Sequence, residues 1–355
     1  MLWRFPVTRA KPLSDTWTWR DYWGAFKVRW GIGRSSYTLE PGLYKLGDPT
    51  DEDLVFVTAN YKLSVDHLRK ALRGRNAWIL VLDTKGINVW CAAGKGTFGT
   101  EELIHRIETT GLLGKKAKRI LILPQLGAPG VSAPAVERAT GFRVIYGPIR
   151  AKDLPKFLDS GLEATEDMRR VTFNLIERIV LIPVELVGLV KPSLLLLGFL
   201  TIVGTLLALV SSLFHTTPVS ISKSLWVAFY TFLPILPAAF LGVILFPILL
   251  PVLPGKAFAC KGAALSVLGI GVYLVGMQSL YGASSLSSIL SLVPYVFLLS
   301  SIVSFLALNF TGSTPFTSLS GVLKEMRIAI PFQAGGFLVG TFWLWVDLFI
   351  KGGNL

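Results

Sequence analysis

The sequence predicts an α/β domain with a mainly parallel, Rossmann-like sheet, followed by an all-α transmembrane domain of five helices. Three observations support this fold class. Residues 1–170 hold 27 of the 35 Lys and Arg residues and 18 of the 22 Asp and Glu residues. In the same half, short apolar runs alternate with helical patterns, as in βα units. The remainder consists largely of apolar stretches of about 20 residues, the length that crosses a bilayer.

We divide the chain into four parts. A basic, Trp-rich arm covers residues 1–36, the α/β domain residues 37–160, a linker with an interfacial amphipathic helix residues 161–191, and the transmembrane domain residues 192–355. The arm contains five tryptophans among Arg and Lys residues, namely Trp3, Trp17, Trp19, Trp23 and Trp30. This composition suits either a membrane interface or an arm that packs on the α/β domain.

The elements of the α/β domain follow from its apolar runs. Strands are expected at residues 54–58, 77–83, 119–124 and 143–146, and helices at residues 63–73, 101–109, 133–140 and 152–158. Ser64 is the expected N-cap of the first of these helices. In a parallel sheet the carboxyl ends of the strands meet at one edge, where ligands bind. Asn60, the loop 125–130 and Gly147-Pro148 all follow strand ends, so they should converge on one site.

The stretch Gly86–Thr100 follows the expected strand 77–83 and contains Cys91, one of only two cysteines. It is dense in small residues, which let a backbone lie close to a large flat ligand. A thiol among them is a candidate soft ligand for a metal carried by that ligand. No second Cys or His lies at the spacing of a zinc site, and the upstream Gly of a P-loop is missing.

The run Asn88–Lys95, with the sequence NVWCAAGK, resembles the signature of the mercury-methylating corrinoid proteins. That family is related to the corrinoid subunit of the iron–sulfur methyl carrier of the acetyl-CoA pathway. The resemblance covers about residues 37–150 and includes residues 41–44, 57–64 and 124–130. It implies a corrinoid as cofactor, with cobalt as its metal.

The resemblance implies that Cys91 is catalytic and is the lower axial ligand of cobalt. A thiolate is a strong, negatively charged donor, so it increases electron density on a methyl group held opposite to it. The methyl group then leaves as a carbanion equivalent or a radical, which a soft acceptor such as Hg(II) is suited to receive. The alternative from the residues alone is a buried thiol that acts as a small hydrophobe.

Further residues are candidates for contact with the cofactor. Asn88 either caps the helix or helps to fix the thiolate, and Lys95 is either solvated or a counter-charge. The small residues beside Cys91 would let the helix approach the macrocycle, whereas His67 and His105 are expected at the surface. The full set of candidates is Thr58, Asn60, Asn88, Val89, Trp90, Ala92, Ala93, Gly94, Lys95, Gln125, Gly127, Gly130, Tyr146 and Pro148.

Two cysteines are too few for an iron–sulfur cluster in this chain, which needs about four thiolates. A corrinoid methyltransferase must be returned to a strongly reduced state, so a separate electron donor is implied. The resemblance identifies it as a ferredoxin-like protein with two [4Fe–4S] clusters, which also becomes a possible Hg(II) donor. The expected methyl donor is a methylated tetrahydrofolate-type carrier.

Five spans are expected, at about residues 193–213, 225–250, 257–280, 288–310 and 330–350. The positive-inside rule places the α/β domain on the cytoplasmic side of the inner membrane and the C-terminus outside. The second span contains four prolines, so we expect it to be kinked or broken. Cys260 is either an inert small residue or a thiol that binds a metal ion transiently. Asp347 lies within the last expected span, where it either has a functional role or is exposed to lipid headgroups.

The net charge of +13 is consistent with anionic lipid. We expect no nucleic acid as partner, because the basic half lacks an Arg-rich helix and an RNA-binding aromatic signature. Three functions remain. The first is a membrane-anchored corrinoid methyltransferase that produces methylmercury, the second a corrinoid methyl carrier of one-carbon and acetyl-CoA metabolism, and the third a non-catalytic membrane protein that binds or transports corrinoids.

Overall fold

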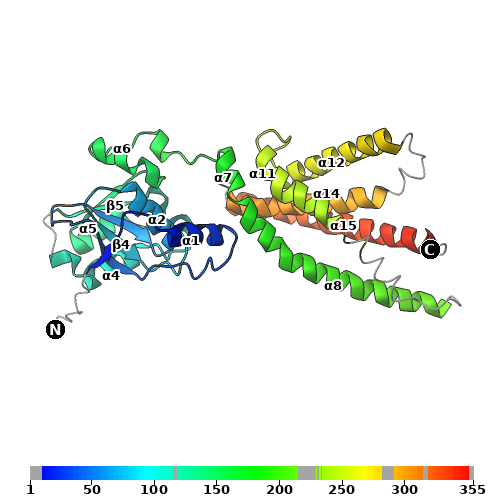
Figure 1. The fold of residues 1–355 in the computed structure, drawn as a ribbon, viewed down its shortest axis with the longest axis horizontal. Helices are drawn as coiled ribbons and strands as arrows, with labels where there is room; N and C mark the ends of the chain where they lie inside the picture. The colour runs from blue at the N-terminus through cyan, green and yellow to red at the C-terminus, as the bar shows by residue number, and fades with distance from the viewer. Residues whose placement is uncertain are drawn as a thin grey trace. The chain divides into compact units, whose positions relative to one another are not determined.

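The computed structural model describes residues 10–114, 118–214, 229, 232, 234–281, 292–314 and 319–351 (Figure 1). The chain forms two compact units, Met1–Val171 and Thr172–Leu355, called unit 1 and unit 2 below. The predicted α/β domain lies in unit 1, and all five predicted spans lie in unit 2.

Unit 1 is built on a mixed sheet that has six strands in the described part of the chain, in the order β1-β2-β4-β3-β5-β6. The strands are β1 (Lys11–Leu13), β2 (Gly42–Leu46), β3 (Val55–Ala59), β4 (Ala77–Leu82), β5 (Ile120–Leu123) and β6 (Arg143–Tyr146). β3 runs parallel to β4 and β5, and β6 runs parallel to β5, which confirms the parallel core. β2 is antiparallel to β4, and neither β1 nor β2 was predicted as a strand.

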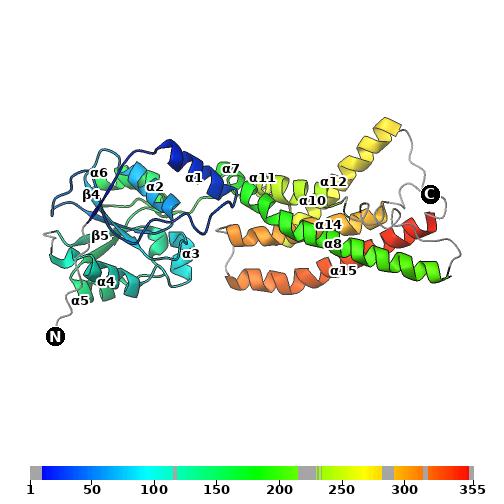
Figure 2. The same ribbon diagram turned by 60° about the horizontal axis from the view of Figure 1, so that its bottom comes forward.

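Helices cover both faces of this sheet, as Figures 1 and 2 show. They are α1 (Trp19–Arg29), α2 (Lys62–Ala71), α3 (Val89–Gly94), α4 (Thr100–Thr109), α5 (Ala133–Thr140) and α6 (Leu154–Asp159). α3, α4 and α5 share one core with Leu80 and Leu82, and α2 and α6 share the other with Ile79 and Val81. Alternate residues of β4 therefore pack into opposite cores, which is why the sequence of this strand is one continuous apolar run.

Two details of the predicted domain are wrong. The N-cap of α2 is Tyr61, and Ser64 instead lies inside the first turn, where its N–H donates to the Tyr61 carbonyl at 2.9 Å. Residues 161–170 were expected to be a polar linker. However, Met168 is buried in the core of unit 1 and its carbonyl accepts from the Ile149 N–H at 2.9 Å. Leu162 and Ala164 pack against the same core, so three apolar residues hold the segment on the domain.

The N-terminal arm is part of unit 1 over its described residues, which begin at residue 10; Trp3 lies outside them. β1 pairs with β2 and extends the sheet. On α1, Asp21 forms ion pairs with Lys62 at 2.5 Å and with Arg69 at 2.8 Å, both on α2. The packing alternative for the arm is therefore what the structure shows for residues 10–36.

The Asp21 cluster predicts a pH dependence of stability. Burial alone would raise the pKa of Asp21, but hydrogen bonds from Lys62, the Thr18 N–H and Arg69 hold that pKa well below its usual value of 3.8. Because the folded-state pKa is lowered, the ionised carboxylate stabilises the fold at neutral pH, and this contribution is lost progressively as the pH falls below about 4.

Asp21→Asn is expected to lower the free energy of unfolding by about 2 kcal/mol at neutral pH, since it weakens charged hydrogen bonds to two partners. Urea unfolding of the detergent-solubilised chain from about pH 7 to about pH 2 measures this. The difference between variant and wild type should shrink as the solution becomes acidic. A difference that stays constant over this range would contradict the assignment.

Unit 2 is helical in the residues that the structure describes. Its elements are α7 (Leu175–Ile179), α8 (Ile182–Phe214), α10 (Ile235–Ala239), the π-helix η5 (Phe240–Leu245), α11 (Phe246–Leu249), α12 (Phe258–Tyr281), α14 (Val293–Asn309) and α15 (Leu319–Lys351). Three described stretches are long and apolar enough to cross a membrane, namely Leu175–Leu206, Val293–Gly312 and Ser320–Val346. Two shorter apolar helices, Ile235–Leu249 and Phe258–Val272, accompany them. The structure does not confirm five spans.

Two expectations for unit 2 are settled by its helices. The interfacial helix was expected at residues 171–190, apart from the first span. Instead, α7 lies within this stretch and residues 182–190 form the first part of α8, which continues through Pro192. The expected kink at 225–250 is confirmed for its described part, because α10, the π-helix η5 and α11 replace one regular helix there. Residues 215–228 and the side chain of Asp347 lie outside the described residues.

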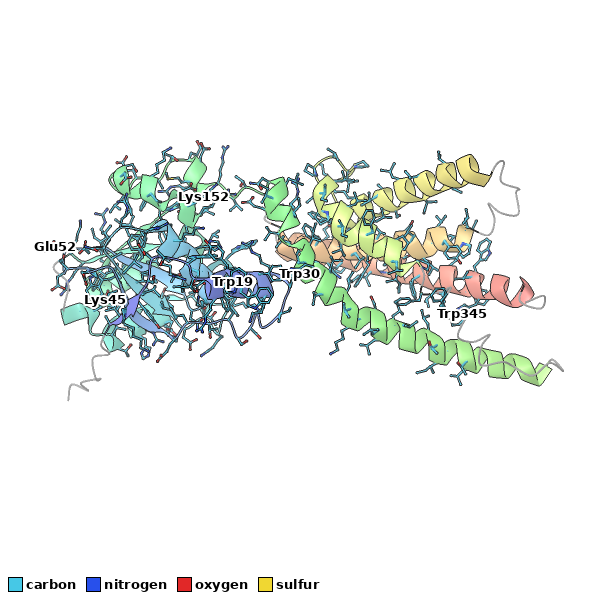
Figure 3. All side chains as sticks on the ribbon, in the orientation of Figure 1. Trp19, Trp30, Lys45, Glu52, Lys152 and Trp345 are labelled. Atoms are coloured by element: carbon cyan, nitrogen blue, oxygen red, sulfur yellow. The ribbon has the colours of Figure 1, made fainter. Side chains whose placement is uncertain are left out.

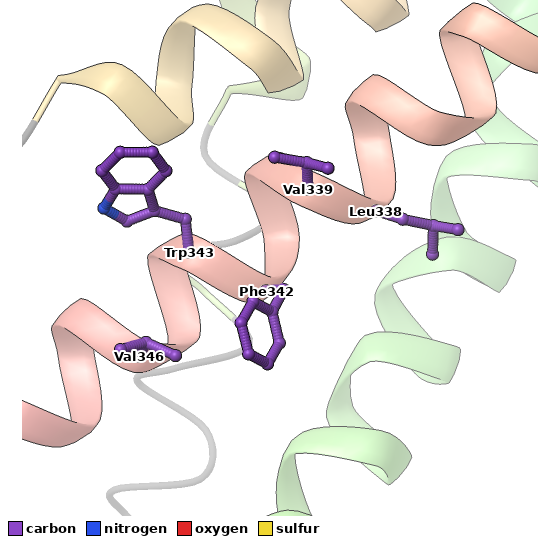
Figure 4. Close-up of a pocket in the computed structure, with 5 residues that line it drawn as sticks. All are labelled: Leu338, Val339, Phe342, Trp343 and Val346. Atoms are coloured by element: carbon purple, nitrogen blue, oxygen red, sulfur yellow. The ribbon is translucent and has the colours of Figure 1, made fainter.

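The surface of α15 is strongly apolar on one side. Phe342 is exposed, and together with Leu338, Val339, Trp343 and Val346 it lines an open apolar groove (Figure 4). Such a surface is what a helix presents to lipid chains.

Candidate functional site

The turn after β4 is held by the side chain of Asn60, which follows β3. Asn60 is buried, and its Oδ1 accepts from the Thr84 N–H at 3.2 Å, the Thr84 hydroxyl at 2.8 Å and the Gly86 N–H at 2.9 Å. Asn60 therefore uses its carbonyl oxygen within the turn rather than as the acceptor proposed for the corrin amides, and its Nδ2 donates to Asp83 Oδ1 at 3.5 Å. It positions the turn that leads to Cys91.

The turn itself needs an unusual backbone. Lys85 and Gly86 both have a positive φ, 58° and 72°, and the Ile87 N–H donates to the Thr84 carbonyl at 3.2 Å. These are the features of a type I′ turn. A Cβ on Gly86 would lie 2.8 Å from the Ser35 carbonyl oxygen, so glycine is required there both by conformation and by space.

The short helix α3 begins and ends with recognisable caps. The Cys91 N–H donates to Asn88 Oδ1 at 3.0 Å, which makes Asn88 the N-cap. At the other end, Gly96 has φ +80°, its N–H donates to Ala93, and the Thr97 N–H donates to Ala92. This pair of bonds is a Schellman motif. Both ends of a helix of six residues are thus fixed by sequence-specific contacts, which fixes the orientation of Cys91.

The exposed face of α3 consists of Trp90, Cys91, Gly94 and Lys95. Gly94 lies one turn after Cys91, and a Cβ added to it would meet no atom of the described residues within 4 Å. Open space therefore adjoins the thiol. His67 and His105 are exposed, as expected.

The other small residues of the motif point the opposite way. Val89, Ala92 and Ala93 are buried in the core of unit 1. The expected approach of a macrocycle to Ala92 and Ala93 is therefore not supported for their side chains. Of the three small residues after Cys91, only Gly94 shares its face, so the small size of the two alanines serves packing.

The loop after β5 packs directly on α3 and on Phe98. A Cβ on Gly127 would lie 2.6 Å from the Phe98 ring, and one on Gly130 would overlap the Phe98 carbonyl oxygen and approach Ala93. Both glycines, proposed to contact the cofactor, are thus needed for this close approach. Phe98 was not among the predicted site residues, although its place among glycines in the run Gly96–Gly99 was a signal of tight packing.

Gln125 is the polar group of this edge that stands out. Its Oε1 is buried, and it has no hydrogen-bond partner among the described residues. Such an atom costs free energy unless a ligand, water or ion satisfies it. Gln125 begins the loop at the carboxyl end of β5, so the unpartnered acceptor belongs to the edge of the sheet that presents Cys91.

The remaining candidates have structural contacts. The Tyr146 hydroxyl donates to the Val131 carbonyl at 2.6 Å, and burial raises the pKa of Tyr146. Pro148 is buried, and Thr58 is buried within β3. These residues shape the edge. The side chains open to a ligand are those of Trp90, Cys91 and Lys95, beside the free space at Gly94.

Substitutions of Gly130 and Gly94 distinguish a glycine that is required for packing from one that faces open space. Gly130→Ala is expected to lower the free energy of unfolding by about 2 kcal/mol, because the loop must move away from Phe98. Gly94→Ala should leave it unchanged or raise it by up to about 1 kcal/mol, since alanine favours the helix. Urea unfolding of both detergent-solubilised variants gives the comparison. Equal stabilities would show that the 125–130 loop does not depend on this contact.

The site fits a large metal-bearing cofactor that brings its own ring ligands. No group of three His, Cys, Asp or Glu residues that could hold a metal ion occurs in the residues described. The exposed thiol of Cys91 lies beside open space and could supply one donor to such a cofactor, and the buried acceptor of Gln125 belongs to the same edge of the sheet.

Comparison with known proteins agrees with this geometry. Residues 32–158 match the family model of the CO dehydrogenase/acetyl-CoA synthase delta subunit. A segment of 128 residues is 34% identical to the acetyl-CoA decarbonylase/synthase complex subunit gamma of Methanopyrus kandleri, over 36% of this chain and 27% of that protein. The corrinoid/iron–sulfur protein large subunit of Moorella thermoacetica is 27% identical over 126 residues, which is 35% of this chain and 28% of that subunit.

The chain thus spans about a quarter of the length of the curated relatives it matches. Within that limit, residues 32–158 form a domain similar to those of the corrinoid/iron–sulfur proteins, a family of corrinoid-dependent methyl transfer. The matched segment contains all the strand ends that form the candidate site.

Proposed function

We propose that this chain is a membrane-anchored, corrinoid-dependent methyltransferase that transfers a methyl group to Hg(II) and produces methylmercury. The observation that carries the proposal is the exposed thiol of Cys91 on a capped helix at the carboxyl edge of the sheet. The motif Asn88–Lys95 that holds it resembles the signature of the mercury-methylating family.

Each residue of the exposed face has a separate task in this proposal. Cys91 would be the lower axial ligand of cobalt, Asn88 holds the backbone N–H of Cys91, and Gly94 leaves room for the macrocycle. Lys95 would balance negative charge, and Gln125 would use its unpartnered acceptor on a polar group of the corrin ring. When bound, the corrinoid supplies the methyl group, held on cobalt.

The thiolate favours Hg(II) as the acceptor. The negatively charged sulfur of Cys91 would raise electron density on the methyl group that the cofactor carries, so this group would leave with both electrons of its bond. Hg(II) is soft and electrophilic and takes those electrons into the new carbon–mercury bond. The cycle then needs two electrons, for which we propose a ferredoxin-like partner with two [4Fe–4S] clusters, and a methylated tetrahydrofolate-type carrier as methyl donor.

The membrane part of the proposal rests on unit 2. Three of its described stretches are long and apolar enough to cross a membrane. We propose the inner membrane as the location, with unit 1 on the cytoplasmic side and the C-terminus outside, because the basic residues between the expected spans fall mainly on one side.

A second candidate function is favoured by the names of the relatives. They are subunits of an acetyl-CoA decarbonylase/synthase complex and of a corrinoid/iron–sulfur protein. On that basis the chain would carry a methyl group for acetyl-CoA metabolism, and mercury would be incidental. The shared segment is confined to unit 1, so the relatives do not account for unit 2.

Methyl transfer by the purified chain distinguishes these functions. The detergent-solubilised protein, loaded with methylcobalamin, is supplied either with Hg(II) as its bis-thiolate complex or with an acetyl-CoA synthase and its substrates. We expect methylmercury in the first case, formed faster than with methylcobalamin and no protein. Transfer to the synthase without methylmercury would establish the carrier function and refute the mercury proposal.

A further inference from the structure

Helix α1 presents a row of aromatic side chains to solvent. Trp19 is 77% exposed, and Trp23 and Phe26 are each 49% exposed. The rings of Trp23 and Phe26 stack at 5.3 Å, and those of Phe26 and Trp30 lie 6.1 Å apart. We call these four residues the aromatic stripe; Figure 3 labels Trp19 and Trp30, near the two ends of α1. Their spacing of four, three and four residues places them along one side of the helix.

The stripe cannot be buried by a simple rotation of α1, because the other side of the helix is fixed. Asp21, Gly24, Ala25 and Val28 are buried. Asp21 is paired with Lys62 and Arg69, and a Cβ on Gly24 would overlap the ring of Tyr37. α1 therefore buries small and charged residues and exposes its largest apolar residues, which is the reverse of an ordinary amphipathic surface helix.

The exposed charges beside the stripe all have one sign. The basic residues of α1 and the turn after it are Arg20, Lys27, Arg29 and Arg34, and each is exposed or half-exposed. The sole acidic residue of the sequence between 19 and 34 is Asp21, which is buried and already paired. Exposed tryptophans flanked by cations are the composition of an interfacial membrane helix.

We infer that the aromatic stripe of α1 binds the surface of an anionic bilayer, with the tryptophans at headgroup depth and the basic residues on lipid phosphates. The complementary charge identifies lipid as the partner, and unit 2 supplies apolar helices that would place the same chain at a membrane. The inference rests on the membrane anchoring proposed above, and it adds a second, reversible contact within unit 1.

This contact would act on the candidate site through the segment that follows α1. The Lys62 N–H donates to the Tyr37 carbonyl at 2.9 Å, and the Leu39 N–H donates to the Asn60 carbonyl at 2.8 Å. Residues 35–39 thus lie against the strand-end loop and turn that position Cys91. A bilayer that holds α1 would hold this edge of the sheet near the membrane surface.

Photo-crosslinking of the full chain tests the inference. Phe26→p-benzoylphenylalanine places a photoreactive ring in the stripe, Lys152→p-benzoylphenylalanine is an exposed control on another element of unit 1, and Phe342→p-benzoylphenylalanine reports on α15. Each variant is placed in nanodiscs of phosphatidylcholine alone or of equal parts phosphatidylcholine and phosphatidylglycerol. After irradiation, mass spectrometry identifies whether each ring has attached to lipid, to this chain, to a second copy or to nothing.

Lipid adducts at positions 26 and 342, with at least about tenfold less at 152, are expected, and more at 26 when phosphatidylglycerol is present. Adducts at 342 but not at 26 overturn the inference and leave the anchoring of unit 2 intact, whether position 26 joins protein or nothing. Equal lipid adducts at 26 and 152 also overturn it. No lipid adduct at 342 refutes the anchoring and the inference with it.

A charge variant makes the test independent of the photoreactive residue's fit. Arg20→Gln, Lys27→Gln, Arg29→Gln and Arg34→Gln together should reduce the lipid adduct at position 26 about fivefold in the anionic nanodiscs. The adduct at position 342 should not change. An unchanged adduct at position 26 would show that anionic lipid is not the partner of these residues.

Discussion

Cys91→Ala is expected to reduce methylmercury formation by more than about a hundredfold in anaerobic cells that express the chain with the proposed ferredoxin-like partner. The reason is that a directly coordinating ligand matters more than outer partners, whose loss already costs 10- to 100-fold. The thiol is exposed, so its removal leaves no buried cavity and unit 1 should fold normally.

Cys260→Ala is the matched control for this experiment. It removes the other cysteine of the chain, which is also exposed but lies on α12 in unit 2. If methylmercury is lost only in the Cys91 variant, the thiol of α3 is specifically required. A comparable loss in both variants would point instead to a general need for thiols to deliver Hg(II), and an active Cys91→Ala protein would contradict the proposed mechanism.

Gly94→Leu is expected to weaken corrinoid binding by about 10- to 100-fold, the equivalent of 1–3 kcal/mol of overpacking, while the fold is unaffected. In the absence of ligand the position is open, and leucine is a better helix former than glycine. Only a large ligand against this face would make the side chain unfavourable. Titration of cobalamin into the purified variant measures the affinity, and urea unfolding measures the stability.

Gly94→Ala separates size from chemistry at this position. Its methyl group occupies little of the open space, so its corrinoid affinity should lie between those of the wild type and the leucine variant. If Gly94→Leu binds cobalamin as tightly as the wild type, the macrocycle does not lie against α3. If both the stability and the corrinoid affinity of Gly94→Leu fall, the substitution has disturbed the helix. The affinity of Gly94→Ala then shows how far corrinoid binding depends on side-chain size at this position.

The sequence predicted the parallel core of unit 1 well because each of its strands is buried on both faces. β4 is the clearest case, an uninterrupted apolar run whose alternate residues enter two cores. β2 was not predicted, although residues 41–44 were noted as part of the resemblance. This strand begins directly after the pair Pro41-Gly42 and is only five residues long, so its pattern has no clear period.

The arrangement of the strand ends around the candidate site was predicted, but the contacts between its residues were not. The strand ends converge as expected, yet the bonds from Asn60 to Thr84 and Gly86 join residues 24 and 26 positions apart, and no local pattern shows them. α3 has six residues, too few for a helical period to reveal that Ala92 and Ala93 face the core. Phe98 packs against the loop after β5, which is distant in sequence, so its packing role could not be predicted from its neighbours in the chain.

In unit 2, a proline does not end a helix as its local preference would predict. An interfacial helix at residues 171–190 was expected to be separate from the first span at about 193–213, but α8 runs from Ile182 to Phe214 and continues through Pro192. A membrane helix tolerates proline when neighbouring groups satisfy the freed carbonyl. The proline-rich stretch 225–250 is interrupted as expected over its described residues, because the π-helix η5 lies within it.

Whether the Cys91 thiolate binds cobalt can be measured by X-ray absorption at the cobalt edge. The purified chain is loaded with cobalamin, and its spectrum is compared with those of Cys91→Ala and Cys260→Ala. We predict a sulfur atom in the coordination shell of cobalt in the wild type and in Cys260→Ala, and its absence in Cys91→Ala. A cobalt shell without sulfur in the loaded wild-type protein would contradict the account, because the thiol would then be a surface residue beside the cofactor.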